Sequence, residues 1–385
     1  MAKLIIDALP LLFSGGISNY VAPFVQRLVL AGSSQWRIRQ VFRLGPSASR
    51  WRKYREYRRR HLSDEVEINW TLLPDRVTIP LWEHGLTFPF FPDEGGDHVF
   101  IATTELVPKR RKGRVGWIVY DFTPYHLSEI FSIDKAEFLE AAARRAHRTD
   151  FIIAISESTK KDVVGLLNYP EDRVCVVYPG TNPNTPSASL HPFAPPGRRR
   201  YIYYLGSLAP SKNVDGMLRI FSRLIHAYHL DLDIVLTGKD FCGESFWTQL
   251  VRELKIEGRV HFTGWISDRD RDCLLDGALM LWQFSWYEGF GLPVLEAAGR
   301  GIPVMHTNRG SVPEILQNPE QQVDPSDEVE AAARAAAALS SAETLARWKR
   351  QGLSRAAGFT WEKSVNGFLK WLETMLKEKA LPWAK

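Results

Sequence analysis

Two glutamates flank a glycine-rich turn in the C-terminal half of the chain. Glu288 and Glu296 are separated by seven residues, and the turn between them begins Gly289-Phe290-Gly291-Leu292. A strand-like run precedes the turn, and Pro293 suits the first turn of a helix because its missing N–H is not needed there. Such a helix start gathers free N–H groups and the positive end of the helix dipole, which favour a diphosphate. The pattern predicts a nucleotide-sugar site with Glu288 before the helix and Glu296 one turn inside it.

A second loop with residues suited to phosphate is Gly206-Ser207-Leu208-Ala209-Pro210-Ser211-Lys212-Asn213. It lacks the second glycine of a P-loop and has Asn213 where a Ser or Thr would bind magnesium, so the sequence argues against an ATPase. Lys212 is a candidate cation for neutralising a leaving diphosphate. The alternative interpretation is an ordinary lysine at the start of a helix.

A glycine pair, Gly15-Gly16, follows the first strand-like run. Glycine lets the backbone come close to a phosphate or a sugar, and a helix is expected over residues 17–30. The pair does not match the dinucleotide fingerprint G-x-G-x-x-G, and a simple tight turn is the alternative interpretation.

Neither a metal site nor a hydrolase is indicated. Asp231-Leu232-Asp233 and Asp268-Arg269-Asp270 resemble the D-x-D motif of metal-dependent sugar transferases. The first, however, enters an apolar strand, and the second follows Ser267 as the acidic first turn of a helix. No histidine pair has zinc spacing, and no G-x-S-x-G sequence marks a nucleophile. We expect no metal and no other cofactor.

Length and composition fit a large globular enzyme. A chain of 385 residues exceeds what one hydrophobic core usually supports, so two domains are expected. Three scattered cysteines, Cys175, Cys242 and Cys273, do not suggest a disulfide framework and favour a reducing cytoplasm. Asp7 and Pro10 interrupt any signal-peptide core, and no apolar run is long enough to span a bilayer. We expect a cytoplasmic protein whose membrane association would be peripheral, at the inner face of the cytoplasmic membrane.

The formal net charge is +5, from 49 Lys and Arg against 44 Asp and Glu, and the basic excess lies early in the chain. The segment Arg50 to Arg60 interleaves cations with aromatic residues, and Lys109 to Arg114 is a second basic cluster. Such clusters favour anionic partners, although a solvated helix face and a loop are the alternatives. Acidic lipid or pyrophosphate matches the first cluster, with the aromatic region from Trp82 to Phe91, better than nucleic acid does. We expect no nucleic-acid partner.

Short β-rich runs alternate with amphipathic segments, which predicts an α/β fold with two doubly wound parallel sheets. The strands are expected at 3–7, 99–103, 117–120, 151–155, 174–178, 201–205, 232–236, 260–262, 278–284 and 303–306, and helices at 328–340 and 361–379. A stretch rich in Pro, Ser and Asn over 181–197 separates the halves. The expected division is 1–185, a linker at 186–199, 200–360 and a final helix at 361–385, with the two domains facing across a cleft.

These residues resemble the GT-B glycosyltransferases of family 4, the retaining group that includes bacterial mannosyl- and glucosyltransferases. The resemblance covers most of the chain, and its most specific element is the E-x7-E motif from Glu288 to Glu296. The supporting segments occur in the order that the family leads us to expect. They are Gly15 to Tyr20, Ile155 to Lys160, Val177 to Gly180, Gly206 to Asn213, Phe262 to Trp265, Ala297 to Val304, Ser311 to Glu314 and Phe359 to Glu362.

The resemblance implies a role for most of these residues. Glu288 would contact the transferred sugar, Glu296 would bind the ribose, and Lys212 with the Gly289 to Leu292 amides would offset charge on the diphosphate. The remaining donor-binding candidates are Gly16, Gly206, Ser207 and Asn213, with Gly238, Lys239, Trp265 and Ile266 near the base. The resemblance also implies retention of anomeric configuration without a metal, an acceptor on residues 1–185, and a final helix that packs back on that domain.

The chain departs from the family pattern at two positions. Ser211 stands where close relatives usually have an arginine, so one phosphate-binding cation is missing. The histidine that usually precedes an aspartate after a central N-terminal strand is replaced by Tyr120, followed by Asp121. We take Tyr120 and Asp121 as the candidate catalytic residues of that loop. His126 is a candidate substitute, and its alternative interpretation is a partly exposed loop histidine.

The sequence thus predicts a retaining, metal-independent glycosyltransferase. It would move a hexose, with mannose and GDP-mannose favoured, from a nucleotide diphosphate sugar to a growing glycan or a lipid-linked acceptor, with anionic membrane contacted through Arg50 to Arg60. Two alternatives stay open because of Tyr120 and Ser211. One is a catalytically silent protein of the same fold that binds a sugar nucleotide or glycan, and the other is a sugar-nucleotide epimerase.

Overall fold

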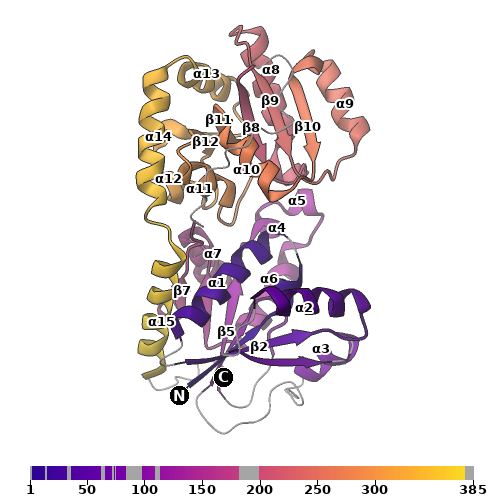
Figure 1. Cartoon of the computed structure of the whole chain (residues 1–385), viewed down its shortest axis with the longest axis vertical. Helices are drawn as coiled ribbons and strands as arrows, with labels where there is room; N and C mark the ends of the chain where they lie inside the picture. Colours follow the sequence, from indigo (N-terminus) through magenta and orange to yellow (C-terminus); the bar gives the residue numbers. More distant parts are fainter. Residues whose placement is uncertain are drawn as a thin grey trace. The chain divides into compact units, whose positions relative to one another are not determined.

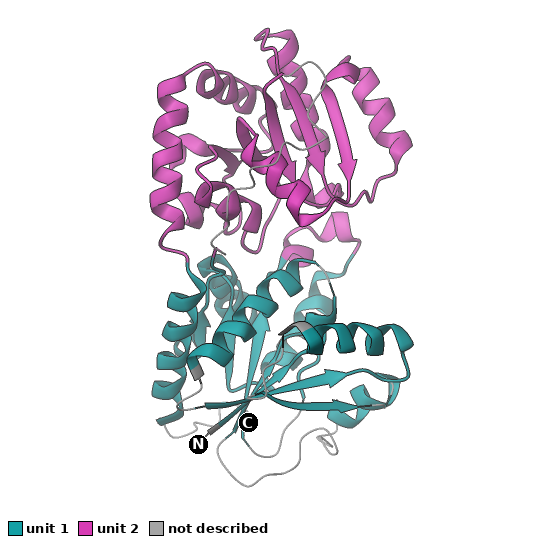
Figure 2. Ribbon diagram, viewed as in Figure 1, with its two compact units in different colours: residues 1–122, 133–180, 360–385 teal, residues 123–132, 181–359 magenta. Residues whose placement is uncertain are grey.

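The computed structural model describes residues 2–13, 15–32, 36–61, 66–71, 73, 75–83, 98–108, 113–181 and 199–377. The chain forms two compact units (Figure 2). Unit 1 consists of residues 1–122, 133–180 and 360–385, and unit 2 of residues 123–132 and 181–359. The short segment 123–132 therefore belongs to unit 2 although unit 1 flanks it on both sides. The linker expected at 186–199 lies outside the described residues, apart from Arg199.

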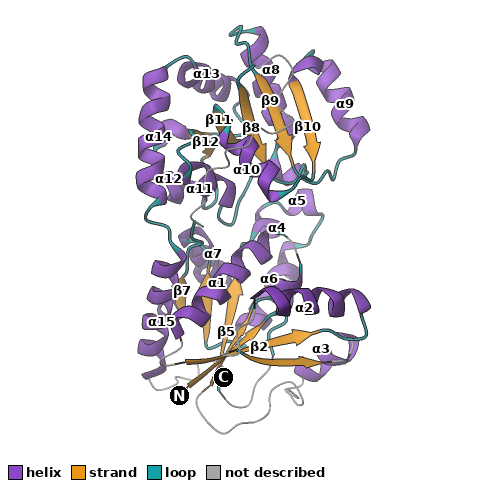
Figure 3. Ribbon diagram, in the orientation of Figure 1, coloured by secondary structure: helices purple, strands orange, loops and turns teal. Residues whose placement is uncertain are grey.

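Unit 1 is built on a seven-stranded parallel sheet (Figures 1 and 3). The strands are β1 (Ala2–Asp7), β2 (Trp36–Arg43), β3 (Glu67–Thr71), β4 (His98–Ala102), β5 (Arg114–Val119), β6 (Phe151–Ala154) and β7 (Val174–Val176). Their order is β3-β2-β1-β4-β5-β6-β7. The chain winds outward from β1 to β3 and then returns to the other side of β1 to form β4. The carboxyl ends of β1 and β4 therefore flank the switch point at which open α/β sheets bind ligands.

The last helix of the chain packs on unit 1 through aromatic residues. The helices of this unit are α1 (Gly16–Gly32), α2 (Ala48–His61), α3 (Asp75–Glu83), α6 (Lys135–Ala146), α7 (Glu157–Leu167) and α15 (Trp361–Lys377). The ring of Trp361 lies 5.2 Å from that of Tyr20 on α1, and Phe368 lies 5.7 Å from Phe24. Because positions 361 and 368 share one face of a helix, this contact runs along α15.

Helix α2 packs aromatic residues against the sheet and leaves several cations exposed. Tyr54 is buried with its ring 5.0 Å from Phe42 of β2, and Trp51 lies 5.2 Å from the half-exposed Trp70 of β3. The exposed cations of the helix are Arg52, Arg55, Arg58 and Arg59. The other segments predicted to share anionic contacts, Lys109 to Lys112 and residues 84–91, lie outside the described residues.

Unit 2 contains a six-stranded parallel sheet (Figures 1 and 3). The strands are β8 (Tyr201–Leu205), β9 (Asp233–Thr237), β10 (Val260–Gly264), β11 (Met280–Gln283), β12 (Val304–Thr307) and β13 (Gln322–Val323), in the order β10-β9-β8-β11-β12-β13. The helices are α4 (Thr123–His126), α5 (Ser128–Phe131), α8 (Val214–His226), α9 (Glu244–Glu253), α10 (Asp268–Asp276), α11 (Leu292–Gly299), α12 (Val312–Leu316), α13 (Glu328–Leu339) and α14 (Ala342–Ala356).

The two faces of the unit 2 sheet carry different side chains. Met280 and Trp282 of β11 are buried in the main core with residues of α8, α9 and α13. Because side chains alternate along a strand, Leu281 and Gln283 point to the other face. That face is covered by α11 and α12, which contact β11 and β12. A polar side chain, Gln283, is therefore buried at the end of the central strand β11.

The predicted α/β fold with two parallel sheets is confirmed, and each expected strand is present with some ends shifted by one to three residues. Strands β2, β3 and β13 and helix α14 were not predicted from the sequence. β2 was hidden because arginines interrupt its apolar pattern. The structure buries Arg39 of β2 by pairing it with Glu67 of β3, so two strands that read as polar support each other.

The carboxyl ends of β8, β9 and β10 come close together at two glycines that were predicted to bind the donor. The amide of Gly206 donates to the carbonyl of Thr237 at 2.9 Å, and that of Gly238 to the carbonyl of Gly264 at 3.1 Å. Gly238 has a φ of 150°, and a Cβ there would lie 1.9 Å from the carbonyl oxygen of Gly206. Only glycine permits this approach.

We predict that Gly238→Ala destabilises the protein by about 3 kcal/mol or more, because the added methyl group meets backbone that cannot move freely. Gly243→Ala is the matched control: Gly243 has a φ of 94°, but no atom lies within 4 Å of the position of its Cβ. The control should lose only about 1–2 kcal/mol from backbone strain. Urea unfolding of the two variants measures the difference, and equal losses would contradict the explanation.

Candidate active site

The switch point of the unit 2 sheet lies between β8 and β11. From β8 the chain winds to β9 and β10, and β11 then pairs with the opposite edge of β8. Loops leave the carboxyl ends of these two neighbouring strands and carry Lys212 and Glu288. The structure therefore brings together two predicted residues that are 76 positions apart, at the edge where such sheets bind ligands.

The carboxylate of Glu288 is held through one oxygen. Oε1 accepts hydrogen bonds from Lys212 Nζ at 2.9 Å, from Gln283 Nε2 at 2.8 Å and from Ser285 Oγ at 2.7 Å. Among the residues that the structure describes, no side chain donates to Oε2. The Glu288 side chain is 13% exposed and that of Lys212 is 24% exposed. Since an ionised carboxylate has lone pairs on both oxygens, Oε2 is the oxygen left to accept hydrogen bonds from a ligand.

Backbone contacts fix the loop that carries Glu288. The amide of Trp286 donates to the carbonyl of Ser211 at 3.0 Å, and Asn213 Nδ2 donates to the carbonyl of Phe284 at 3.2 Å. The carbonyl of Glu288 accepts from Ser311 Oγ at 3.0 Å. Asn213 and Ser211 are both buried. The structure thus uses the side chain of Asn213, a predicted donor contact, to join the two loops.

The turn after Glu288 leads into a helix start. Helix α11 begins at Leu292 with Pro293 in its first turn, and Gly291 caps it with a φ of 95° that favours glycine. Phe290 is buried, with its ring 6.0 Å from Phe359. The first N–H groups of a helix have no acceptor within the helix, so residues Gly289 to Leu292 form the predicted helix mouth.

Glu296 lies one turn inside α11, as predicted, and is partly buried. Burial raises the pKa of its carboxyl group, although the charges of Arg271 and Arg300 act in the opposite direction. Both arginines also pair with Asp272, at 2.9 and 2.7 Å. Their positive charge is therefore shared, and the Glu296 carboxylate is not fully neutralised by them.

The other donor-binding candidates of unit 2 lie at the carboxyl ends of β8, β9 and β10. Gly206 and Ser207 follow β8, and the hydroxyl of Tyr204 donates to the carbonyl of Ser207 at 2.8 Å. Gly238 and Lys239 follow β9, with Lys239 Nζ 4.8 Å from the centre of the Phe241 ring. Trp265 and the half-buried Ile266 follow β10. Trp265 is 81% exposed, which leaves its ring free to stack on a planar ligand.

Gly16 lines a pocket in unit 1. The pocket has a volume of about 340 Å³ and opens at the switch point between β1 and β4. It is lined by the residues that follow β1, by the start of α1 and by the loop after β4, namely Leu9, Pro10, Phe13, Gly15, Gly16, Ile17, Ser18 and Thr104. Phe13 and Ile17 keep 42% and 46% of their surface exposed. The pocket combines apolar side chains with backbone and hydroxyl groups.

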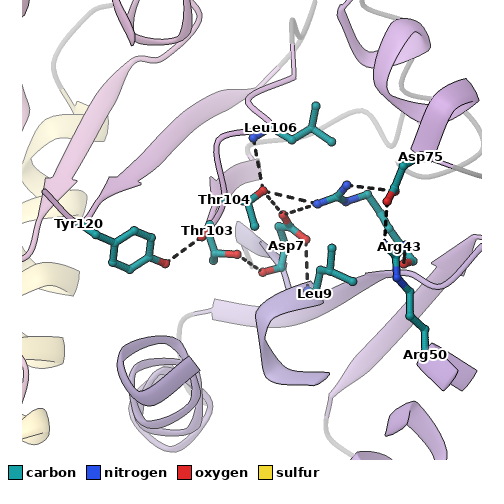
Figure 4. Close-up of polar contacts among 9 residues, drawn as sticks. All are labelled: Asp7, Leu9, Arg43, Arg50, Asp75, Thr103, Thr104, Leu106 and Tyr120. Carbon is teal, nitrogen blue, oxygen red and sulfur yellow. Dashed lines mark hydrogen bonds and ion pairs between the residues drawn. The ribbon is translucent and has the colours of Figure 1, made fainter. Parts of the chain in front are cut away.

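A buried aspartate, which was not predicted as a site residue, binds residues that line this pocket (Figure 4). Asp7 Oδ2 accepts from Thr104 Oγ1 at 3.0 Å and from Arg43 Nη2 at 3.4 Å, and its backbone carbonyl accepts from Thr103 Oγ1 at 2.6 Å. Arg43 also reaches Asp75 at 3.3 Å. The signal available in the sequence was an acidic residue at the end of an apolar strand.

Tyr120, predicted to be catalytic, has its hydroxyl engaged in the same region. It donates to the carbonyl of Thr103 at 2.8 Å, and burial raises the pKa of the phenol well above its usual value (Figure 4). Asp121 follows β5 and is half-buried. His126 lies in unit 2, where its ring stacks on Tyr287 with centroids 4.3 Å apart. The histidine considered as a substitute is therefore packed beside the residue that precedes Glu288.

Both Asp-x-Asp segments make structural contacts, as the sequence analysis proposed. Asp231 pairs with Arg259 at 2.6 Å, and the buried Asp233 lies 3.0 Å from His261. Ser267 caps helix α10 by accepting from the amide of Asp270. Gln283 and Ser285, by contrast, contact Glu288 directly and were not predicted. Their signal was a polar pair at the end of an otherwise apolar strand.

Comparison with known proteins finds similarity to glycosyltransferases. The family described as Glycosyl transferases group 1 matches residues 190–355. The O-antigen chain mannosyltransferase B of Escherichia coli is 26% identical over 276 residues, covering 69% of this chain and 71% of that protein. The MMP alpha-(1->4)-mannosyltransferase of Mycolicibacterium hassiacum is 27% identical over 58% of this chain and about half of its own length, 54%.

Solved structures extend the likeness to nearly the whole chain. The crystal structure of the Anabaena protein HepE in complex with UDP and glucose has a TM-score of 0.71 and 16% identity, and the match covers 97% of this chain and 100% of that one. At this level of identity the likeness shows the fold. The comparisons thus show a group 1 glycosyltransferase match over residues 190–355, mannosyltransferase relatives about a quarter identical in sequence, and the GT-B fold over nearly the whole chain.

Proposed function

We propose that this glycosyltransferase moves mannose from GDP-mannose to a growing glycan or a lipid-linked acceptor, with retention of configuration and without a metal ion. The observation that carries the proposal is the contact between Lys212 and Glu288 at the switch point of the unit 2 sheet. A carboxylate and an ammonium group side by side are suited to a ligand with a sugar at one end and a diphosphate at the other.

The chemistry follows from these two charges. Glu288 Oε2 would accept hydrogen bonds from hydroxyls of the bound sugar. Lys212 and the N–H groups at the start of α11 would stabilise the negative charge that grows on the diphosphate as the glycosidic bond breaks. The acceptor would attack the resulting oxocarbenium-like centre from the face that the diphosphate leaves, which retains the anomeric configuration. Because fixed cationic and N–H groups perform this role, the proposal needs no metal.

Mannose is chosen because several of the similar proteins are mannosyltransferases. The contacts proposed for the nucleotide come from residues at the carboxyl ends of the unit 2 strands. The Glu296 carboxylate would accept hydrogen bonds from the ribose hydroxyls. The exposed ring of Trp265 and the turn at Gly238 and Lys239 would contact the base. Resemblance to the family favours GDP as the nucleotide.

We assign the acceptor to unit 1. The pocket beside Gly16 offers Phe13 and Ile17 to the apolar face of a sugar and offers Ser18 and Thr104 as polar partners. Asp121, at the end of β5, is the candidate for a polar contact to an acceptor hydroxyl. Tyr120 would support this loop, since its hydroxyl holds the Thr103 carbonyl.

Helix α2 is the part of unit 1 that would contact anionic lipid at the inner face of the cytoplasmic membrane. Its exposed arginines share the helix with Trp51, whose ring contacts the half-exposed Trp70, and aromatic residues with cations are typical of membrane-water interfaces. Within the described part of the chain, no helix combines the length and apolar character needed to span a bilayer. Contact through α2 would be peripheral and would hold the enzyme near a lipid-linked acceptor.

We predict that Glu288→Ala and Lys212→Ala each lower the rate of GDP release from GDP-mannose by about a hundredfold or more, because each removes a preorganised transition-state contact. Glu257→Ala and Lys161→Ala change exposed residues of the same types and should leave the rate unchanged. The rate should also survive EDTA. A Glu288→Ala variant that keeps the wild-type rate would refute the proposal. The identity of the nucleotide base is checked separately by thermal shift with GDP-, UDP- and ADP-sugars, because a ligand that binds the folded protein raises its melting temperature.

We predict that Glu296→Gln weakens GDP binding about tenfold while raising the melting temperature near pH 7. The raised pKa means that folding favours the protonated carboxyl, so its contribution to stability is lost as pH rises through the folded pKa. Gln removes that unfavourable charge. The advantage in melting temperature should therefore shrink as pH falls toward 4. If the difference in melting temperature between Glu296→Gln and the wild type did not vary with pH, the raised pKa of Glu296 would be contradicted.

We predict that Arg55→Gln/Arg59→Gln weakens binding to vesicles containing anionic lipid at least fivefold, since each cation near such a surface contributes about 1 kcal/mol. Lys349→Gln/Arg350→Gln makes the same charge change at exposed positions of α14 and serves as the control. Vesicle sedimentation at low and high salt measures both pairs. Equal binding by the two double variants would rule out α2 as the membrane contact.

A further inference from the structure

We propose that Gln283, together with Ser285, forms a neutral clamp that keeps Glu288 in place when Lys212 turns toward the diphosphate of the donor. Gln283 is in this view a positioning residue, because it contacts Glu288 and not the reacting atoms. The inference rests on the proposed roles of Glu288 and Lys212 and adds a device that regulates their geometry.

The location of Gln283 calls for a physical reason. It is the last residue of β11, a strand whose four residues are all buried, and its own side chain is 2% exposed. Leu281, two residues earlier on the same face of the strand, is apolar. Burying an amide in such surroundings is unfavourable unless the amide is hydrogen-bonded.

The hydrogen bonds of Gln283 form a closed triangle with Ser285 and Glu288. Gln283 Nε2 donates to Glu288 Oε1 at 2.8 Å and to Ser285 Oγ at 3.1 Å, and Ser285 Oγ donates to the same Oε1 at 2.7 Å. A carboxylate only accepts hydrogen bonds, so the amide nitrogen has to face it. Both donors therefore act on one oxygen and leave Oε2 free.

Stability alone does not explain why the side-chain amide of Gln283 is buried at the end of β11. Among the described residues, the buried Oε1 of Gln283 has no hydrogen-bond partner. Its register partner on β12 is His306, whose Nδ1 lies 2.8 Å from the carbonyl of Thr307 and so carries the hydrogen. Burial lowers the pKa of His306 to about 4, so its Nε2 is an acceptor near neutral pH and offers no donor to Gln283. An unsatisfied buried oxygen is unfavourable, and an apolar side chain of similar length would avoid it.

The hydrogen bonds of Gln283 are explained if Lys212 pairs first with Glu288 and then with the diphosphate of the donor. Its ammonium group is 2.9 Å from Glu288 Oε1 and partly exposed. A diphosphate carries more negative charge than a carboxylate and would draw the ammonium group toward itself. Gln283 and Ser285 are neutral and do not follow. They would hold Oε1 after the ion pair weakens, so that Oε2 still faces the sugar.

Gln283→Met tests the clamp, because Met keeps the length and burial of the side chain while removing the N–H donor and the unsatisfied oxygen. We expect the kcat for GDP release from GDP-mannose to fall at least tenfold, with UDP release from UDP-glucose measured in parallel. The Kd for GDP, which lacks the sugar, should change less than twofold. The melting temperature should be equal to or higher than that of the wild type. Adding Ser285→Ala should bring the loss close to that of Glu288→Ala.

Gln321→Met is the matched control. Gln321 is also buried in unit 2, but it donates to the backbone carbonyl of Val304 at 2.8 Å, so its replacement should lower the melting temperature without a selective loss of kcat. The clamp is overturned if Gln283→Met keeps kcat within twofold of the wild type, or if it lowers the melting temperature as Gln321→Met does. Turnover that survives Glu288→Ala would instead refute the proposed function.

Discussion

One carboxylate oxygen, Glu288 Oε1, receives hydrogen bonds from Lys212, Gln283 and Ser285, which come from the loop after β8 and from β11 and its loop. This convergence depends on the order of the strands. Because β8 and β11 are neighbours although β9 and β10 lie between them in the sequence, their following loops leave the sheet side by side. The backbone bonds from Trp286 to Ser211 and from Ser311 to Glu288 then fix the loops against each other.

The same topological rule places the second site. In unit 1 the chain reverses between β1 and β4, and Asp7 at the end of β1 binds Thr103 and Thr104 after β4. The pocket beside Gly16 opens at that point. In both units a carboxylate at the switch point orders its neighbours, but Asp7 is fully buried and structural, whereas Glu288 keeps an oxygen free.

Much of this could be predicted from the sequence, because parallel strands are continuous apolar runs and the Glu288 turn has a helix start with a fixed residue pattern. Strand β2 could not be predicted, because the pairing of Arg39 with Glu67 on the neighbouring strand is a tertiary contact that local composition does not show. Gln283 was missed for a related reason. Its importance lies in a hydrogen bond to a residue beyond the end of its strand, and a single polar residue in an apolar run has many interpretations.

The structure adds side-chain contacts for two loop residues that the sequence could only place by position. The sequence places Tyr120 at the end of a central strand, where catalytic residues are common, and the structure shows its hydroxyl donating to the carbonyl of Thr103, just after β4. His126, for which a bland interpretation was preferred, stacks on Tyr287 in unit 2. Both contacts depend on side-chain direction, which residue type alone does not give.

A crystal structure of the protein with GDP-mannose tests the central claim most directly. The account predicts sugar hydroxyls on Glu288 Oε2, Lys212 Nζ on the diphosphate, and Glu288 Oε1 still within hydrogen-bond distance of Gln283 and Ser285. A nucleotide sugar bound elsewhere in unit 2, with the contact between Lys212 and Glu288 unchanged, would contradict it.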